Sequence, residues 1–98
     1  MALIRATFPE DEETAIAVAM CESGLRADAY NPANNNGTTD GGLYQLNSVH
    51  DARLAELGLD KWNVEDNIAY ARMLYDESGW TPWVCHNKGL HLKYLAQA

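Results

Sequence analysis

One carboxyl group stands out among the residues that could do chemistry. Glu22 directly follows Ala19, Met20 and Cys21, so it lies near the end of an otherwise apolar helical stretch. An apolar surrounding raises the pKa of a carboxyl group by desolvation, and a carboxyl that stays protonated at neutral pH can act as a general acid. The alternative is an ordinary surface glutamate near a helix end. Position in the chain alone does not decide between the two.

Glycines and amides follow one another between residues 41 and 47. Gly41 and Gly42 permit a positive φ angle and a close approach of the backbone to a ligand, although they could also form a simple turn. Gln45 and Asn47 carry amides, whose paired donors and acceptors suit the hydroxyl and acetamide groups of sugars. The segment therefore favours a polar ligand over an apolar one.

Metal binding and nucleophilic catalysis are poorly supported. The histidines and cysteines show neither CxxC nor HExxH spacing; they are Cys21, His50, Cys85, His86 and His91. Ser23 lacks the GxSxG turn of a serine hydrolase. We therefore predict no metal and no cofactor. Two cysteines alone leave open whether they form a disulfide or stay as reduced thiols.

Charge and hydropathy exclude several classes of function. The chain has 98 residues and a formal net charge of -7, and its basic residues are scattered. Nucleic-acid binders present a basic stripe, so we exclude DNA and RNA as partners. No apolar run approaches the roughly 20 residues of a membrane span. Acidic residues at positions 10–13 interrupt the N-terminal segment, so we predict no signal peptide within this chain.

The elements that must position these residues are mostly helical. Apolar spacing predicts a first helix over residues 11–25 and further helices over 49–57, 64–76 and 89–96. The run 34–42 predicts a loop or an irregular hairpin, and the alternation in 43–47 predicts a short strand. No repeat or linker divides the chain. We therefore expect one mostly α domain, residues 1–98, with a short extended or β-hairpin insert beside a cleft.

Four segments in this order resemble the lysozyme-like superfamily, in particular soluble lytic transglycosylases, goose-type lysozymes and phage muralytic domains. The resemblance spans about residues 14–90 and rests on Cys21-Glu22-Ser23-Gly24-Leu25, Gly41-Gly42-Leu43-Tyr44-Gln45-Leu46-Asn47, Asn67-Ile68-Ala69, and Gly79-Trp80-Thr81-Pro82-Trp83 with Asn87 and Gly89. Each segment is weak alone, but the ordered set is specific. It implies an α+β lysozyme-like fold.

The resemblance also implies an activity. Glu22 corresponds to the glutamate of the Glu-Ser-Gly motif, which protonates the glycosidic oxygen between N-acetylmuramic acid and N-acetylglucosamine. The partner is then a glycan strand of peptidoglycan, met outside the cytoplasm at the bacterial cell wall by a secreted or phage-borne enzyme. We expect a monomer. Hydrolysis and lytic transglycosylation both remain open.

The resemblance assigns substrate contacts along the whole chain. The residues expected to line the cleft are Ser23, Gly42, Tyr44, Gln45, Asn47, Trp80, His86 and Asn87, with Gly41 beside them. Trp80 is expected to stack on a sugar ring, whereas Trp83 is expected in the core. His86 stands where many relatives carry tyrosine in a Tyr-Asn-x-Gly pattern, which puts the role of this ring in question.

The cysteine pattern resembles the resuscitation-promoting factors of actinobacteria. In those proteins the cysteine before the catalytic glutamate is bonded to one that follows a tryptophan near the C-terminus. The resemblance therefore implies a Cys21–Cys85 disulfide beside the active site.

A second catalytic carboxylate would decide the mechanism. Asp40 is the best-placed candidate and Asp28 is more remote, but either could be an ordinary loop aspartate. Many members of the families that this chain resembles use a single glutamate, with the 6-hydroxyl of the substrate closing an anhydro product. We rank that mechanism above one with two carboxylates.

Two other kinds of function compete with an enzyme. A catalytically inert glycan-binding module would keep the cleft without the chemistry, and replacement of Glu22 would then change only affinity. A small helical protein-interaction domain would need an exposed apolar patch, which the sequence does not reveal.

Overall fold

A single buried helix runs through the middle of the protein. The computed structural model describes residues 1–95, and in it α2 (Glu12–Ser23) buries five consecutive residues, Ala15 through Ala19. A helix that is buried all round must be covered from several sides. It contacts α1 (Ala2–Thr7), α5 (Val84–Asn87) and α6 (Leu92–Leu95). The prediction for 11–25 is thus confirmed as an element, and the left-handed Gly24 ends it.

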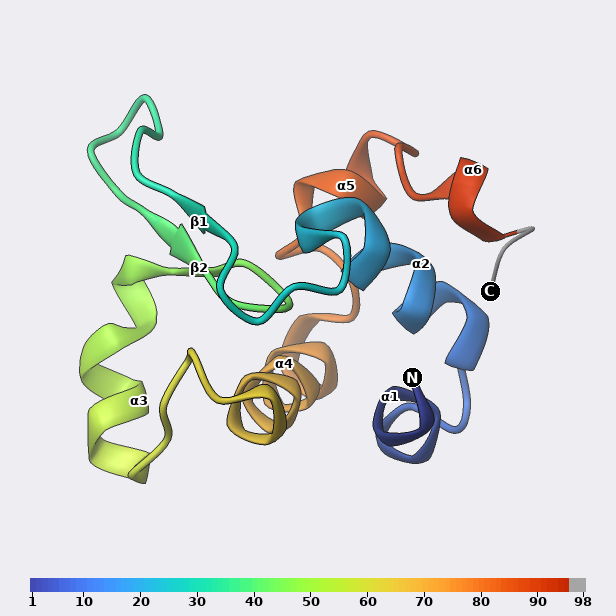
Figure 1. Ribbon diagram of the computed structural model, residues 1–98, viewed down its shortest axis with the longest axis horizontal. Coiled ribbons are helices and arrows are strands. Elements are labelled where there is room, and N and C mark those ends of the chain that lie inside the picture. Colours follow the sequence, from blue (N-terminus) through green and yellow to red (C-terminus); the bar gives the residue numbers. More distant parts are fainter. Residues whose placement is uncertain (96–98) are drawn as a thin grey trace.

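The remaining helices are arranged around this core. Figure 1 shows α3 (Asp51–Leu57) beside the small sheet on one side of the molecule and α1, α2, α5 and α6 on the other, with α4 (Val64–Ser78) between them. None of the helices in residues 1–95 has the length and hydropathy to cross a bilayer. The observed mixture of helices and a small antiparallel sheet confirms the expected α+β lysozyme-like fold.

The N-terminal helix α1 was not expected, since 11–25 was predicted to be the first helix. Six residues are too few to show a clear 3.6-residue period, and so short a helix depends on tertiary packing. Ile4 and Phe8 supply that packing by entering the core. Phe8 stacks in tilted or edge-on geometry against Tyr44, Tyr75 and Trp80.

The sheet is smaller than the alternating pattern predicted. Its strands β1 (Tyr30–Asn31), β2 (Asp40–Gly41) and β3 (Leu46–Asn47) have two residues each and pair in antiparallel order β1-β2-β3. The strand expected over 43–47 is wrong for its first half, because residues 42–45 form a turn. The backbone N–H of Gln45 closes this turn by donating to the Gly42 carbonyl. Tyr44 occupies that turn, fully buried, and donates its hydroxyl to the Ala15 carbonyl at 2.7 Å.

The other helical predictions hold with shifted bounds. A 3-10 turn η1 (Ser48–His50) precedes α3, and the helix predicted over 64–76 continues to Ser78. The Asn63 side chain caps α4 by accepting from the Asp66 amide. The helix predicted over 89–96 is reduced to α6, because residues 89–91 form turns that follow α5, and residue 96 lies outside the described residues.

Candidate active site

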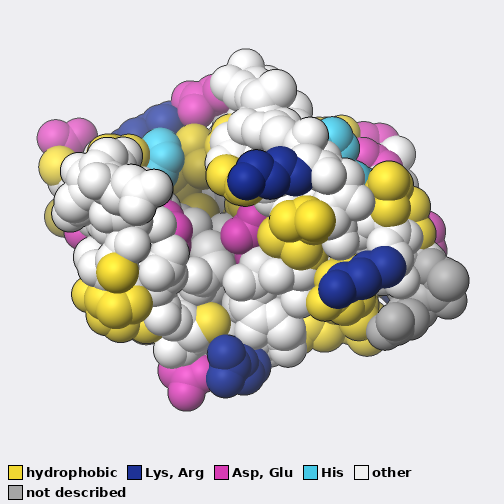
Figure 2. Space-filling model, turned by 90° about the horizontal axis from the view of Figure 1, so that it is seen from above, with side chains coloured by type: hydrophobic (Ala, Val, Ile, Leu, Met, Phe, Trp, Pro, Cys, Tyr) yellow, Lys and Arg dark blue, Asp and Glu magenta, His cyan; other side chains and the backbone are white. Residues whose placement is uncertain are grey.

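A cleft separates the helical part of the protein from the sheet. The cavity has a volume of about 420 Å³. Figure 2 shows the hollow, with acidic side chains on both of its sides and hydrophobic side chains deeper inside. Its lining is polar on the sheet side and apolar on the helical side; the residues are Glu22, Asn34, Asn35, Asn36, Thr38, Asp40, Gln45, Leu46, Asn47, His50, Leu74, Pro82, Trp83 and Val84.

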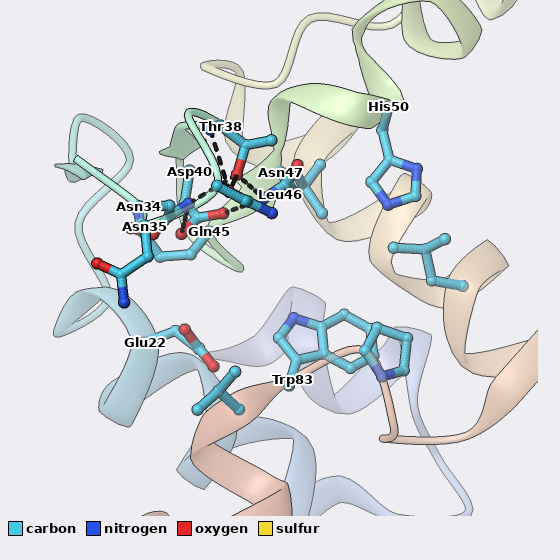
Figure 3. Close-up of a pocket in the computed structure, with 14 residues that line it drawn as sticks. Glu22, Asn34, Asn35, Thr38, Asp40, Gln45, Leu46, Asn47, His50 and Trp83 are labelled. Atoms are coloured by element: carbon cyan, nitrogen blue, oxygen red, sulfur yellow. Dashed lines mark hydrogen bonds between the residues drawn. The ribbon is translucent and has the colours of Figure 1, made fainter. Parts of the chain in front are cut away.

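The helical wall carries Glu22 among apolar groups. Glu22 comes from the last turn of α2 and reaches into the cavity beside Trp83 and Val84 (Figure 3). Its pKa is raised from the ordinary 4.5 to about 7, chiefly by burial; a hydrogen bond from the Cys85 amide opposes this rise, and the negative charge of Asp40 adds to it. At neutral pH a large fraction of this carboxyl is therefore protonated, as a general acid requires.

A disulfide fixes the backbone on which this carboxyl depends. Cys21 and Cys85 are bonded, which agrees with the pairing implied by the family resemblance. Cys21 is the neighbour of Glu22 in α2, and the backbone amide of Cys85 donates to Glu22 Oε2 at 3.3 Å. The bond therefore connects α2 to α5 at the position of the acid.

The sheet wall holds Asp40 in a set of side-chain amides. Asn34 donates to Asp40 Oδ2 at 3.0 Å, Asn31 to the same oxygen at 3.5 Å, and Asn47 to Oδ1 at 3.1 Å. Asn31 and Asn47 are the direct cross-strand partners of Asp40 in the sheet register, so their side chains share its face. Three side-chain amides therefore hold the Asp40 carboxyl group in one orientation.

A hydroxyl and a turn complete this wall. Thr38 Oγ1 accepts from the amides of both Asn34 and Asn47, which keeps the two amides in place beside Asp40. Gln45 has a positive φ of 50° and donates its amide to the carbonyls of Ala29 and Gly42. The side chains are thus oriented by one another before any ligand arrives.

Four of the predicted site residues meet in the cleft, and they come from segments far apart in the sequence. Glu22 lies on one side, and Asp40, Gln45 and Asn47 lie on the other.

Three of the predicted substrate contacts, Ser23, Gly42 and Tyr44, are not part of the cleft lining. Ser23 is buried and donates to the Ala19 carbonyl, and Tyr44 is enclosed in the core. Gly42, with φ of +83°, lies so close to the Asn67 amide and the Lys61 carbonyl that a Cβ would collide with both. The glycine allows the turn to approach α4 and the loop before it closely.

Both tryptophans lie in the hydrophobic core, which confirms the expectation for Trp83, whereas Trp80 is not part of the cleft lining. Trp80, expected in the cleft, is 7% exposed and donates its indole N–H to Asp11 at 2.8 Å. Trp83, expected only in the core, is 3% exposed, but its ring forms part of the cleft lining while its N–H donates to the Tyr44 carbonyl. The turn between α4 and α5 decides which ring faces the cavity, and spacing alone does not define this turn.

His86 and Asn87 also lie outside the cleft lining. His86 stacks on Trp80 and on His91, and burial together with the charge of His91 lowers its pKa. Asn87 is exposed and donates to the Thr81 carbonyl at 2.7 Å. Both belong to α5, which turns these side chains away from the cavity.

Several cleft residues escaped the sequence analysis. Asn34, Asn35 and Asn36 belong to the run 34–42, which predicts a loop or an irregular hairpin; the repeated amides of this run were the available signal. His50 borders the cleft and exchanges a 2.9 Å hydrogen bond between its Nδ1 and the Tyr70 hydroxyl; burial lowers its pKa. Within residues 1–95, no cluster of three or more His, Cys, Asp or Glu residues could hold a metal ion.

Comparison with known proteins points in one direction. Residues 3–85 match the family model described as a lysozyme like domain. The chain is 36% identical over 97 residues to lysozyme C, milk isozyme, of Canis lupus familiaris, covering 83% of this chain and 75% of that protein. It is 28% identical to lysozyme 1 of Musca domestica and 31% identical to lysozyme P of Drosophila melanogaster, each over 78 residues. Those two alignments cover 67% of this chain and 55% of each fly protein.

Proposed function

The chain belongs to the family of lysozyme-like domains, and from that premise we propose that it is a glycosidase that cleaves peptidoglycan between N-acetylmuramic acid and N-acetylglucosamine. The observation that carries the proposal is the pairing of two carboxyl groups in opposite environments across one cleft. Desolvation raises the pKa of Glu22 and favours its protonated form, whereas side-chain amides surround and orient the carboxyl group of Asp40. Such a pair is typical of glycosidases, in which one carboxyl donates a proton and the other supports positive charge.

In the proposed reaction Glu22 gives its proton to the oxygen of the glycosidic bond. The bond between that oxygen and C1 of the muramic acid ring breaks, and the leaving sugar departs with the proton as its new hydroxyl. Positive charge develops on the ring, and the Asp40 carboxylate stabilises it or bonds to C1. Glu22, now ionised, removes a proton from water as the water oxygen bonds to C1; where Asp40 has bonded to C1, that bond breaks in the same step and the Asp40 carboxylate is released. This step returns Glu22 to its protonated state.

Hydrolysis with two carboxylates is favoured over transglycosylation with one. Asp40 is held by three amides and faces the same cavity as Glu22, which supports a direct part in the chemistry. The relatives with the highest identity reported above also carry the name lysozyme. We therefore place the two-carboxylate mechanism above the single-glutamate mechanism that the sequence favoured.

The site of action follows from the substrate. Peptidoglycan lies outside the bacterial cytoplasm, and the Cys21–Cys85 disulfide suits an oxidising environment. We propose that the protein works there as a monomer. Sedimentation velocity at micromolar concentration checks the oligomeric state, and a sedimenting dimer would contradict it.

Mass spectrometry of soluble fragments from purified peptidoglycan tests the proposal. The wild type should release fragments with reducing muramyl ends, and the Glu22→Gln variant should release at least about 1000-fold less. Glu56→Gln, which changes an exposed glutamate in α3, is the matched control and should keep full activity.

Each alternative gives a different set of products. Fragments with anhydro-muramyl ends would show that the reaction is lytic transglycosylation and not hydrolysis. Unchanged activity in Glu22→Gln would remove the acid from the mechanism. If the wild type binds the wall but releases no fragments, the protein is an inert glycan-binding module.

A further inference from the structure

A second concavity lies outside the catalytic cleft. Its volume is also about 420 Å³, within the range of about 300–1,000 Å³ that is usual for small-ligand sites. It shares no lining residue with the cleft, and it is formed by the sheet, α3 and the loop before α4. The lining combines two aromatic rings with a polar rim; the residues are Tyr30, Thr39, Asp51, Leu54, Ala55, Leu59, Asp60, Lys61 and Trp62.

Two exposed aromatic rings form its most unusual feature. Trp62 is 45% exposed and Tyr30 is 56% exposed, whereas Trp80 and Trp83 are buried. The rings of Tyr30 and Trp62 meet edge to face, with centroids 5.9 Å apart. Large aromatic side chains that stay this open at a concavity mark a binding surface more often than a structural one.

The structure fixes Trp62 in place before any ligand binds. Its ring lies directly on Gly41, where a Cβ would come within 2.6 Å of the indole. The backbone amide of Trp62 donates to Asp60 at 2.9 Å, which anchors the loop. The indole N–H itself has no partner among the described residues and remains available to a ligand. A preformed aromatic surface of this kind loses little conformational entropy on binding.

Strand pairing separates this surface from the catalytic residues. Tyr30 pairs with Gly41, and Asn31 pairs with Asp40. Neighbouring residues of a strand point to opposite faces. In agreement, Asp40 and Asn47 line the cleft, whereas Tyr30 lines the second concavity. The aromatic surface and the carboxylate Asp40 thus lie on the two faces of one small sheet.

The polar rim suits a neutral ligand. Lys61 is paired with Asp51 at 2.6 Å, so it offers no free cation for an anion. Asp60 and Asp51 leave acceptor oxygens, and Thr39 adds a hydroxyl. Apolar ring faces surrounded by hydroxyl, carboxylate and indole N–H groups match a sugar, which has one apolar face and a rim of hydroxyls.

We propose that this concavity is a second glycan-binding site, which holds an N-acetylated sugar segment of the wall outside the catalytic cleft. The choice of sugar rests on the proposed function. A glycan held at the back of the sheet would keep the enzyme on an insoluble strand between cleavages. Its contribution is expected on the insoluble wall and not on short soluble oligomers.

The three indole N–H signals provide a direct test. In the 15N-labelled Glu22→Gln variant, which prevents turnover, Trp83 reports on the cleft, Trp62 on the second site and Trp80 on the core. Titration with a trimer of N-acetylglucosamine should shift the Trp62 signal in a saturable manner and leave Trp80 unmoved. The additional replacement Tyr30→Ala should weaken the binding reported by Trp62 about two- to tenfold, with no change in that reported by Trp83.

The outcomes separate this proposal from the previous one. A shift of Trp83 alone would overturn the second site while leaving the glycosidase intact. A saturable shift of Trp62 in a protein that releases no wall fragments would support the site although the enzyme proposal had failed. No movement of either signal up to millimolar trimer would overturn the second site.

Retention on insoluble peptidoglycan gives an independent measurement. Tyr30→Ala should reduce the bound fraction about two- to tenfold while activity on a short soluble oligomer stays unchanged. Leu57→Ala, which removes a similarly exposed apolar side chain from α3 outside both cavities, is the matched control. Equal retention by Tyr30→Ala, Leu57→Ala and the wild type would overturn the proposal.

Discussion

The two walls of the cleft hold the same chemical group in opposite surroundings. On the helical wall, Glu22 is partly buried beside Trp83 and Val84 and receives one hydrogen bond, from a backbone amide. On the sheet wall, Asp40 receives hydrogen bonds from three side-chain amides. The two carboxyl groups thus differ in their surroundings, one desolvated by apolar neighbours and the other held by amide donors, and such differences can separate the roles of two carboxyl groups in one cleft.

The walls also differ in how they are built. The helical wall depends on one long buried helix and a disulfide, so its carboxyl is positioned by covalent and apolar contacts. The sheet wall consists of two-residue strands, and its carboxyl is positioned by hydrogen bonds between polar side chains. Substitutions in the helical wall and substitutions in the sheet wall should therefore have different effects on activity and on the free energy of unfolding.

Among changes to the sheet wall, removing its negative charge should have the largest effect. Asp40→Asn keeps the size of the side chain but leaves no carboxylate to stabilise positive charge, so we expect kcat/KM on peptidoglycan to fall about 100- to 1000-fold. Circular dichroism should show an unchanged fold. Activity within threefold of the wild type would mean that the helical wall suffices, as in a single-glutamate mechanism.

Opening the disulfide should weaken the helical wall alone. The double variant Cys21→Ser, Cys85→Ser frees a long loop in the unfolded chain, and we expect the free energy of unfolding in urea to fall by about 3 kcal/mol. Activity should also fall, because the amide that donates to Glu22 is no longer held in place. A loss of less than about 1 kcal/mol would show that packing, and not the bond, joins α2 to α5.

The apolar environment of Glu22 should appear as a pH-dependent cost in stability. Its pKa in the folded state, about 7, lies above the ordinary 4.5, so the folded protein is destabilised as pH rises through 7 and the group ionises. We expect Glu22→Gln to exceed the wild type in free energy of unfolding by about 2 kcal/mol at pH 9, and this gain should vanish at about pH 4. Urea titrations at both values check it; a gain independent of pH would contradict it.

The smallest expected effect comes from a single amide of the sheet wall. Asn34→Ala removes one donor to Asp40, and we expect about a tenfold loss of kcat. Asn87→Ala, which removes an exposed amide outside the cleft, should change kcat less than about twofold. Equal losses of kcat in the two variants would support Asn87 as a substrate contact. They would also contradict a special role for the amides of the sheet wall.

The sequence predicted best those features that depend on local patterns, such as the apolar period of a helix and the glycine that ends it. The long apolar period gave α2 and α4, and the glycine after each helix marked its end. The family resemblance pointed correctly to a lysozyme-like fold, and the position of Glu22 in an apolar stretch agreed with its partly buried environment. Helix α1 escaped because its stability comes from Ile4 and Phe8 in the tertiary core, which a six-residue window does not reveal.

The direction of a side chain is hard to predict from the sequence. Tyr44, Trp80 and Asn87 lie in the expected segments, but turns place them in the core or at the surface, outside the cleft lining. Asn47 was predicted as a site residue, whereas its companions Asn31 and Asn34 were not. Asn31, Asn34 and Asn47 come together around Asp40 only when the strands pair. Strands of two residues are too short to give a recognisable pattern in the sequence.

Asn67 has a consequence for the order in which the cleft assembles. This buried side chain in α4 accepts from the Tyr44 amide at 2.8 Å and donates to the Lys61 carbonyl at 2.8 Å and to the Gly41 carbonyl at 3.4 Å. Strands of two residues have no independent stability, so the sheet can persist only while α4 is docked against it. Amide hydrogen exchange at Tyr44 should therefore report the opening of the whole sheet. The last folding event should complete the sheet wall rather than the helical wall.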